Sequence, residues 1–216
     1  VLGRWRARPA VPGAKATLPR ITLIIAARSE ANAIGARVEN VLTLDYPNLS
    51  VIVVSDGSED DTAGLAERAG GGQVRVIALP NAVGKTRAID AAVAEVADAV
   101  DVLAFSDATA CWAPDTLRRL VAPFGDPTVG AVSGLVVYDY PEAAVAEGFR
   151  AYQRAIVSHR ADDAKWGTLT SVSGSISAVR RALYAKVPAE VSTDLAIPWL
   201  VARAGARAVF VGDAVS

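Results

Sequence analysis

The sequence contains no methionine, one cysteine and one histidine in 216 residues. The single cysteine, Cys111, excludes a disulfide within the chain, which fits a reducing compartment, and we expect it to be buried as a small apolar filler behind a strand end. The single histidine, His159, has no partners for a Ser-His-Asp arrangement, so we interpret it as a surface or packing residue. Because methionine is missing even at position 1, we expect the sequence to be a domain cut from a longer protein.

Long apolar runs and an excess of charge of one sign are also missing. No run of 18 uncharged apolar residues exists, and the N-terminus lacks the apolar core of a signal peptide, so we expect this piece to be soluble. Charged residues make up 21% of the chain and hydrophobic residues 52%, with a net charge of −1, a globular balance that disfavours nucleic acid as a partner. The length suits one large domain.

The first 20 residues contain no acid but five basic residues, which are Arg4, Arg6, Arg8, Lys15 and Arg20. Such a segment is typical either of a basic arm near an anionic membrane surface or of a solvated linker. We therefore predict an arm or linker at 1–20 and one folded domain at 21–216, with the domain cut short at its C-terminal end.

From residue 21 onward, short β-branched runs alternate with longer helical patterns, which is typical of an α/β fold with a mostly parallel sheet. The runs predict strands at 21–27, 50–55, 74–79, 101–106 and 129–138. The first four are continuous apolar runs, as expected of strands covered on both faces. Helices are predicted at about 30–44, 60–69 and 85–97, and another from Pro114 onward. Ser58 with Asp61 predicts a capping box for the second helix.

The pattern changes near residue 140, which we interpret as a change of role within one domain. Residues 143–162 have the apolar spacing of one amphipathic helix, and 171–187 read as a small-residue segment running into a short helix. Residues 192–214 predict a helix, a glycine stop and a final strand.

Polar residues directly follow four of the predicted strands. They are Arg28 and Glu30 after the first, Asp56 after the second, Lys85 beyond the third and Asp107 at the end of the fourth. Because ligands of open α/β sheets bind at the carboxyl ends of the strands, we expect these side chains to converge there. Each also has a structural explanation: a solvated helix start for the first pair, a turn at Asp56, and a Gly-Lys pair at Lys85 without the rest of a phosphate loop.

Six segments in order carry a more specific resemblance: "IIAARSEANAI", "DYPNLSVIVVSDGSEDDT", "NAVGKTRAIDAAV", "FSDATACWAPDTLRRLV", "VSGSISAVRRALY" and "STDLAIPWLVARAGARAVF". Together they resemble the successive motifs of the family 2 inverting glycosyltransferases, over residues 20–215. The resemblance implies the GT-A fold, a Rossmann-like, mostly parallel central sheet with helices on both faces. It also implies the cytoplasmic domain of a membrane-associated bacterial member.

The resemblance assigns a role to each matching position. The donor, a nucleoside diphosphate sugar, would contact Ala26, Arg28, Glu30, Asp56, Lys85, Ser106 and Asp107. Gly174 and Ser175 would border the acceptor, and Asp194 matches the catalytic base. Asp107 would also ligate a divalent cation, Mg²⁺ or Mn²⁺. Thr109 stands where the family usually has a second acid, and a neutral hydroxyl is a poorer ligand for these ions, so part of the cation's role could fall on Lys85 or Arg87.

We therefore expect an inverting transferase that moves a sugar from a UDP-linked nucleoside diphosphate donor to a hydroxyl of a glycan or a lipid-linked acceptor. Two alternatives stay open: a catalytically silent nucleotide-sugar-binding module, suggested by Thr109, and a sugar-1-phosphate nucleotidyltransferase. The second is disfavoured, because "AARSEAN" lacks the glycine-rich loop of that class. The sequence ends before the Gln-x-x-Arg-Trp motif of processive members, so polymer synthesis and single transfer are both compatible with it.

Overall fold

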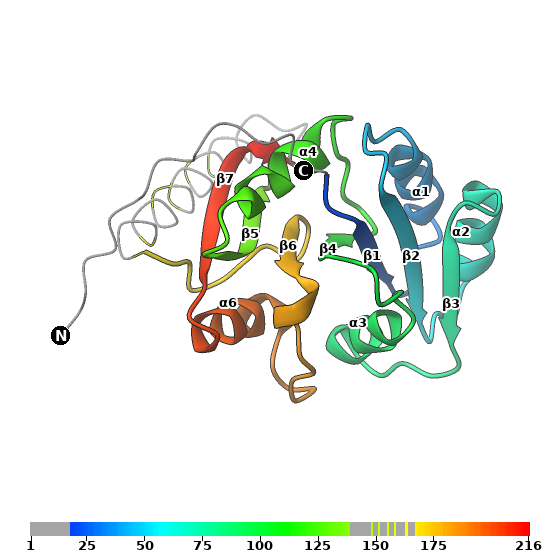
Figure 1. The fold of residues 1–216 in the computed structure, drawn as a ribbon. Helices are drawn as coiled ribbons and strands as arrows, with labels where there is room; N and C mark the ends of the chain where they lie inside the picture. Colours follow the sequence, from blue (N-terminus) through cyan, green and yellow to red (C-terminus); the bar gives the residue numbers. More distant parts are fainter. Residues whose placement is uncertain are drawn as a thin grey trace.

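A seven-stranded sheet forms the centre of the protein (Figure 1). The computed structural model describes residues 18–138 and 167–216, with the single positions 148, 151, 155, 158 and 163 between them. The strand order is β3-β2-β1-β4-β6-β5-β7. Only β6 runs antiparallel to its neighbours, β4 and β5. The strands are β1 Ile21–Ala27, β2 Leu49–Asp56, β3 Arg75–Leu79, β4 Val102–Asp107, β5 Val129–Leu135, β6 Ser177–Arg180 and β7 Arg207–Val215.

Helices cover both faces of this sheet. They are α1 Ile34–Leu42, α2 Thr62–Gly70, α3 Lys85–Ala94, α4 Thr116–Val121 and α6 Thr193–Arg203, with 3-10 turns η1 Ala122–Gly125 and η2 Arg181–Leu183. Alternate residues of β1 point to opposite faces. Leu23 and Ile25 join a core with α1, α2 and α4, whereas Ile24 joins a second core with α3 and α6, which lie along the lower side of Figure 1. The prediction of a mostly parallel, doubly covered α/β sheet is confirmed.

Three strands differ from the sequence prediction. β3 is an edge strand of partly exposed residues. The prediction that its continuous apolar run is covered on both faces is therefore wrong. β5 ends at Leu135 rather than at 138. The antiparallel strand β6 lies where only a small-residue segment was expected, because four residues between polar turns give too short an alternation to be recognised.

Two local predictions are wrong. Cys111 is exposed, because the chain has already left the sheet after Asp107 and turns through a loop there. Ser58 and Asp61 form no capping box: the hydroxyl of Ser58 instead accepts the Ser29 N–H at 3.0 Å, and Asp61 makes no side-chain cap to α2. Asp61 is the N-cap residue of α2, and the carboxylate of Asp60, one residue earlier, accepts the backbone N–H of Thr62 at 3.1 Å.

Some predictions fall on residues that the structure does not describe. The helix expected at 143–162, including His159, lies almost wholly outside the described residues, and so do positions 1–17 of the basic arm. Among the helices of the described residues, none has the length and apolarity needed to span a membrane.

Candidate active site

The carboxyl ends of β1, β2 and β4 bring three of the expected residues to one edge of the sheet. Ala26 near the end of β1 pairs with Val54 on one side and with Asp107 on the other. Asp56 and Asp107 are the last residues of β2 and β4. The two carboxylates therefore flank the end of β1 at one edge of the sheet, as the sequence predicted, with Asp56 two residues further along its strand than Asp107.

The loop after β1 is held by the loop after β2. Side-chain oxygens of Ser58, Thr62 and Asp60 accept the backbone N–H groups of residues 29, 30 and 31 at 2.8 to 3.0 Å. Ser29 has a φ of 53°, a left-handed conformation that costs a non-glycine residue about 1–2 kcal/mol. The loop is thus fixed before any ligand arrives, with Arg28 exposed and Glu30 half-buried.

Asp56 fixes the loop that precedes α3. Its side chain is buried, and its two carboxylate oxygens accept the backbone N–H groups of Val83 at 2.7 Å and Gly84 at 2.9 Å. A Cβ on Gly57 would lie 2.1 Å from the backbone nitrogen of Ala82, so only glycine permits the loop to approach this closely. The carboxylate expected to meet the base therefore also sets where α3, and with it Lys85, begins.

Asp107 lies at the centre of the site. The ammonium of Lys85 donates to its Oδ1 at 2.5 Å, and the hydroxyl of Ser175 donates to its Oδ2 at 2.6 Å. Burial alone would raise the pKa of this carboxyl, but the hydrogen bonds from Lys85 and Ser175 and the charge of Lys85 outweigh it, so the pKa is lowered. Asp107 is thus held ionised between a residue from α3 and one from the loop before β6.

The ammonium of Lys85 and the carboxylate of Asp194 both lie close to Gly174. A Cβ added at Gly174 would lie 2.9 Å from Lys85 Nζ and 3.1 Å from Asp194 Oδ2, so both charged groups lie against this one backbone position. The structure therefore brings together Lys85, Asp107, Gly174, Ser175 and Asp194 from four separate segments.

A proline inside α6 explains how Asp194 is joined to the loop that contains Gly174. Pro198 has no N–H, so the carbonyl of Asp194, four residues earlier, loses its helical partner. The backbone N–H of Val172 donates to this carbonyl at 2.9 Å instead. A second bond links the start of α3 to the approach to α6, because the Thr86 hydroxyl donates to the Val191 carbonyl at 3.0 Å. The helices of Lys85 and Asp194 are thereby held together.

The remaining expected donor residue, Ser106, is buried, and its hydroxyl accepts a hydrogen bond from Arg37 at 2.9 Å. The sequence analysis missed Arg37 and two residues that contact it, Asn40 and Trp112. A signal for Arg37 was present, because it shares the buried face of α1 with Ile34, and an arginine on an apolar helix face is unusual.

The residues around Asp107 fit a divalent cation only in part. Thr109 is exposed, two residues beyond Asp107, and offers a neutral oxygen. No group of three or more His, Cys, Asp or Glu side chains suited to a metal ion occurs in the portion of the chain that the structure describes. A cation here would need further oxygens from a ligand such as a diphosphate.

Comparison with known proteins identifies the same family along most of the chain. The family model described as glycosyl transferase family 2 matches residues 22–187. A curated beta-monoglucosyldiacylglycerol synthase of Synechocystis sp. is 32% identical over 134 residues, which are 58% of this chain and 28% of that protein. A curated N-acetylglucosaminyltransferase of Mesorhizobium japonicum is 28% identical over 217 residues, 92% of this chain and 51% of the relative.

A solved structure agrees with these matches. The mannosyltransferase of Pyrobaculum calidifontis in complex with GDP-Man and Mn²⁺ superimposes with a TM-score of 0.79 at 26% identity, covering 93% of this chain and 56% of its own. The chain thus spans about half the length, or less, of these relatives.

Proposed function

The chain belongs to glycosyl transferase family 2, and on that premise we propose that it transfers a sugar from a nucleoside diphosphate donor to an acceptor hydroxyl with inversion at the anomeric carbon. The observation that carries the proposal is the position of Gly174, against which the Lys85 ammonium and the Asp194 carboxylate both lie. An anion-binding cation and a candidate base thus border one space beside Asp107.

Inversion requires one displacement, and therefore one base and no protein nucleophile. In the proposed step the acceptor oxygen attacks the anomeric carbon while Asp194 takes the hydroxyl proton. The bond between that carbon and the diphosphate oxygen breaks, and its electron pair leaves with the diphosphate. Lys85 would then stabilise the charge that develops on the leaving group.

A divalent cation, Mg²⁺ or Mn²⁺, would be held by Asp107, with Thr109 nearby and the remaining ligands supplied by the diphosphate. When bound, it would neutralise charge on the leaving group. This arrangement is consistent with the single carboxylate available on β4. It predicts that the cation binds weakly until the donor is present.

UDP is our proposed carrier, on the basis of the resemblance alone. Asp56 would accept a hydrogen bond from the base through the lone pairs that its two loop contacts leave free. Ala26, Arg28 and Glu30 would surround the nucleoside at the end of β1. Because a structural neighbour was solved with GDP-Man, a guanosine donor is the specific rival to test.

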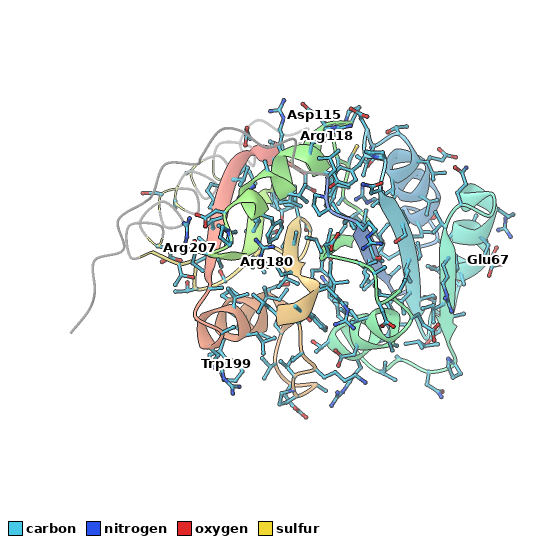
Figure 2. The ribbon with its side chains drawn as sticks, viewed as in Figure 1. Glu67, Asp115, Arg118, Arg180, Trp199 and Arg207 are labelled. Atoms are coloured by element: carbon cyan, nitrogen blue, oxygen red, sulfur yellow. The ribbon has the colours of Figure 1, made fainter. Side chains whose placement is uncertain are left out.

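The acceptor is proposed to be a glycan or a lipid-linked saccharide, and the parent protein to act at the cytoplasmic side of a membrane. Two residues of α6 that follow the proposed base, Leu195 and Trp199, are 57% and 55% exposed, and Trp199 projects at the lower edge of Figure 2. Apolar surface beside the base favours an acceptor with an apolar part. Similarity to a glycolipid synthase supports the same choice.

The site also offers a specific observation in favour of a silent binding module: Thr109 replaces an acid, and Lys85 already neutralises Asp107. The two functions differ in the role of Asp194. We expect Asp194→Asn to keep the donor affinity and to lower transfer by a factor on the order of 10² or more.

The test measures release of the nucleoside diphosphate, which is UDP from UDP-glucose and UDP-N-acetylglucosamine and GDP from GDP-mannose, with Mn²⁺ and with diacylglycerol micelles or N-acetylglucosamine as the acceptor. Donor affinity is measured in parallel by calorimetry. Tight UDP binding with no turnover in either the wild-type or the Asn protein would establish the silent module instead. Full turnover by Asp194→Asn would remove Asp194 from the mechanism.

A further inference from the structure

Helix α1 buries an arginine against the end of β4. Arg37 is 2% exposed and shares the buried face of α1 with Ile34 and Val38. Its guanidinium donates to the Ser106 hydroxyl at 2.9 Å and to the Asn40 side-chain oxygen. No carboxylate of residues 18–138 or 167–216 is paired with it, and its Nε has no hydrogen-bond partner there.

The burial of Arg37 destabilises the fold. Burying a guanidinium without a partner of opposite charge costs several kcal/mol of desolvation, and an apolar side chain of similar volume would avoid that cost. Burial lowers the pKa of Arg37 to about 10, while the charges of Cys111 and Asp107 act in the opposite direction. Because stability alone would favour an apolar residue on this helix face, the contacts of Arg37 are the place to look for its role.

Those contacts lead to both sides of the proposed active site. The guanidinium lies over the Trp112 ring at 4.8 Å from its centroid. The Asn40 side chain, bonded to Arg37, is also bonded twice to the Trp112 backbone, at 2.9 Å each. The Trp112 indole N–H then donates to the Ser175 carbonyl at 3.2 Å, and the Ser175 hydroxyl donates to Asp107.

A second path from Arg37 is shorter. It runs through the Ser106 hydroxyl, which itself donates to the Asp107 carbonyl at 3.1 Å. Arg37 therefore contacts Ser106, the residue before Asp107, directly, and it reaches the Ser175 segment through the ring of Trp112. The Asp107–Ser175 hydrogen bond closes this loop of contacts. The expected donor side and the expected acceptor side meet at that bond.

We propose that Arg37 is a positioning residue, which holds Asp107 and Ser175 in the geometry that transfer requires. The kinetic part of this proposal rests on the function proposed above. The structural part, that Arg37 and Trp112 set the Asp107–Ser175 contact, holds or fails by itself.

The test compares four single variants and one double variant of the full chain. Arg37→Met removes the charge and the planar guanidinium but keeps most of the volume. Arg37→Lys keeps the charge but replaces the planar guanidinium with donors on a single nitrogen. Trp112→Phe removes the indole N–H to Ser175 without changing α1. Arg118→Met is the matched control, because Arg118 also stacks on an aromatic ring, at 5.9 Å from the Tyr46 centroid, but is a partly exposed residue of α4 (Figure 2).

In UDP-glucose turnover with Mn²⁺, we expect Arg37→Met to lower kcat at least about 10-fold with the donor KM within about threefold, because Asp107 keeps its place on β4 and only its contact with Ser175 is disturbed. Arg37→Lys should lie between it and the wild type, and Arg118→Met should match the wild type. Combining Arg37→Lys with Trp112→Phe should cost less than the product of the two single losses, since both act through Ser175. A kcat within twofold of the wild type for Arg37→Met would overturn the kinetic proposal, as would a loss that only follows the unfolded fraction.

The second readout is a ligand-free crystal structure of Arg37→Met, or of Arg37→Lys if the first does not fold. The proposal expects the Asp107–Ser175 hydrogen bond to be broken while β4 and α1 keep their places. A bond still at 2.6 Å would overturn the proposal. If the wild-type protein turned over no donor at all, the function would fail and this structure alone would decide the role of Arg37.

Discussion

Alanine at position 174 tests the geometry of the site with the smallest possible change. The new Cβ would lie 2.9 Å from Lys85 Nζ and 3.1 Å from Asp194 Oδ2. Non-bonded contacts to a carbon atom are free of repulsion at about 3.5 Å or more. The ammonium must therefore move by roughly half an ångström and the carboxylate by a little less. Both groups are ends of side chains, so they can move without disturbing the fold.

The effect on catalysis should therefore be much larger than the effect on stability. Misplacing a catalytic group by about 1 Å costs on the order of 10²-fold, so we expect Gly174→Ala to lower kcat by about 10- to 100-fold, or about 1.4–2.7 kcal/mol of transition-state stabilisation. Gly174 is not among the glycines with positive φ, so its backbone accepts alanine. The lower entropy of the unfolded chain should then leave Tm unchanged or raise it by about 1–4 °C.

Gly35→Ala is the matched control, since a Cβ at Gly35 in α1 would meet nothing within 4 Å. It should stabilise the protein by about 0.5–1 kcal/mol and leave turnover unchanged. The assay is UDP release from the donor that the wild type prefers, beside thermal unfolding of all three proteins. If Gly174→Ala turned over the donor within twofold of the wild type, the claim that Lys85 and Asp194 carry out transfer from positions in contact with Gly174 would be refuted.

Asp107→Ala should weaken the Mn²⁺-dependent part of UDP binding in calorimetry; equal affinities with and without Mn²⁺ in both proteins would contradict this. Asp56→Asn should lower the free energy of unfolding by about 1–3 kcal/mol and weaken nucleotide binding, because an amide oxygen can accept only one of the two loop N–H bonds while its NH₂ faces the other; urea titration showing no loss would count against it. Hydrogen bonds from Thr128 and then Arg207 lower the pKa of Asp126 from 3.8 to about 2, so its ionised form stabilises the fold above about pH 4 and this stabilisation is lost as the pH falls through 2. Asp126→Asn should therefore cost about 1 kcal/mol at pH 7, allowing for solvent screening, and progressively less from pH 4 to pH 2; a pH-independent loss would speak against the pairing.

The parallel half of the sheet and its polar edge could be predicted from the sequence because each signal there is local. The apolar runs predicted at 50–55 and 101–106 are followed directly by Asp56 and Asp107, and the carboxyl ends of parallel strands must share one edge. The resemblance then pointed to Asp194 in the second half, and the structure brings its carboxylate beside Lys85.

The parts that could not be predicted depend on contacts between distant segments. β6 pairs only four residues with β4, so its alternation is too short to detect in the sequence. The consequence of Pro198 appears only when the Val172 N–H is seen at the carbonyl that the proline leaves unpaired. The sequence shows Arg37 as a charged residue on the apolar face of a helix. It does not show its partners, because Ser106 and Trp112 lie about 70 positions further along the chain.

The central claim is that the strand ends and the start of α6 form one site for a nucleoside diphosphate sugar, and thermal unfolding with a nucleotide panel tests it most directly. At about 100 times Kd, a ligand that binds only the folded state adds about 2.7 kcal/mol, or about 5–10 °C in Tm for a chain of this size. We predict such a shift for UDP and a UDP-sugar with Mn²⁺, a smaller shift without Mn²⁺, and none for the free sugar. No shift with any nucleoside diphosphate or its sugar, with or without Mn²⁺, would contradict the claim.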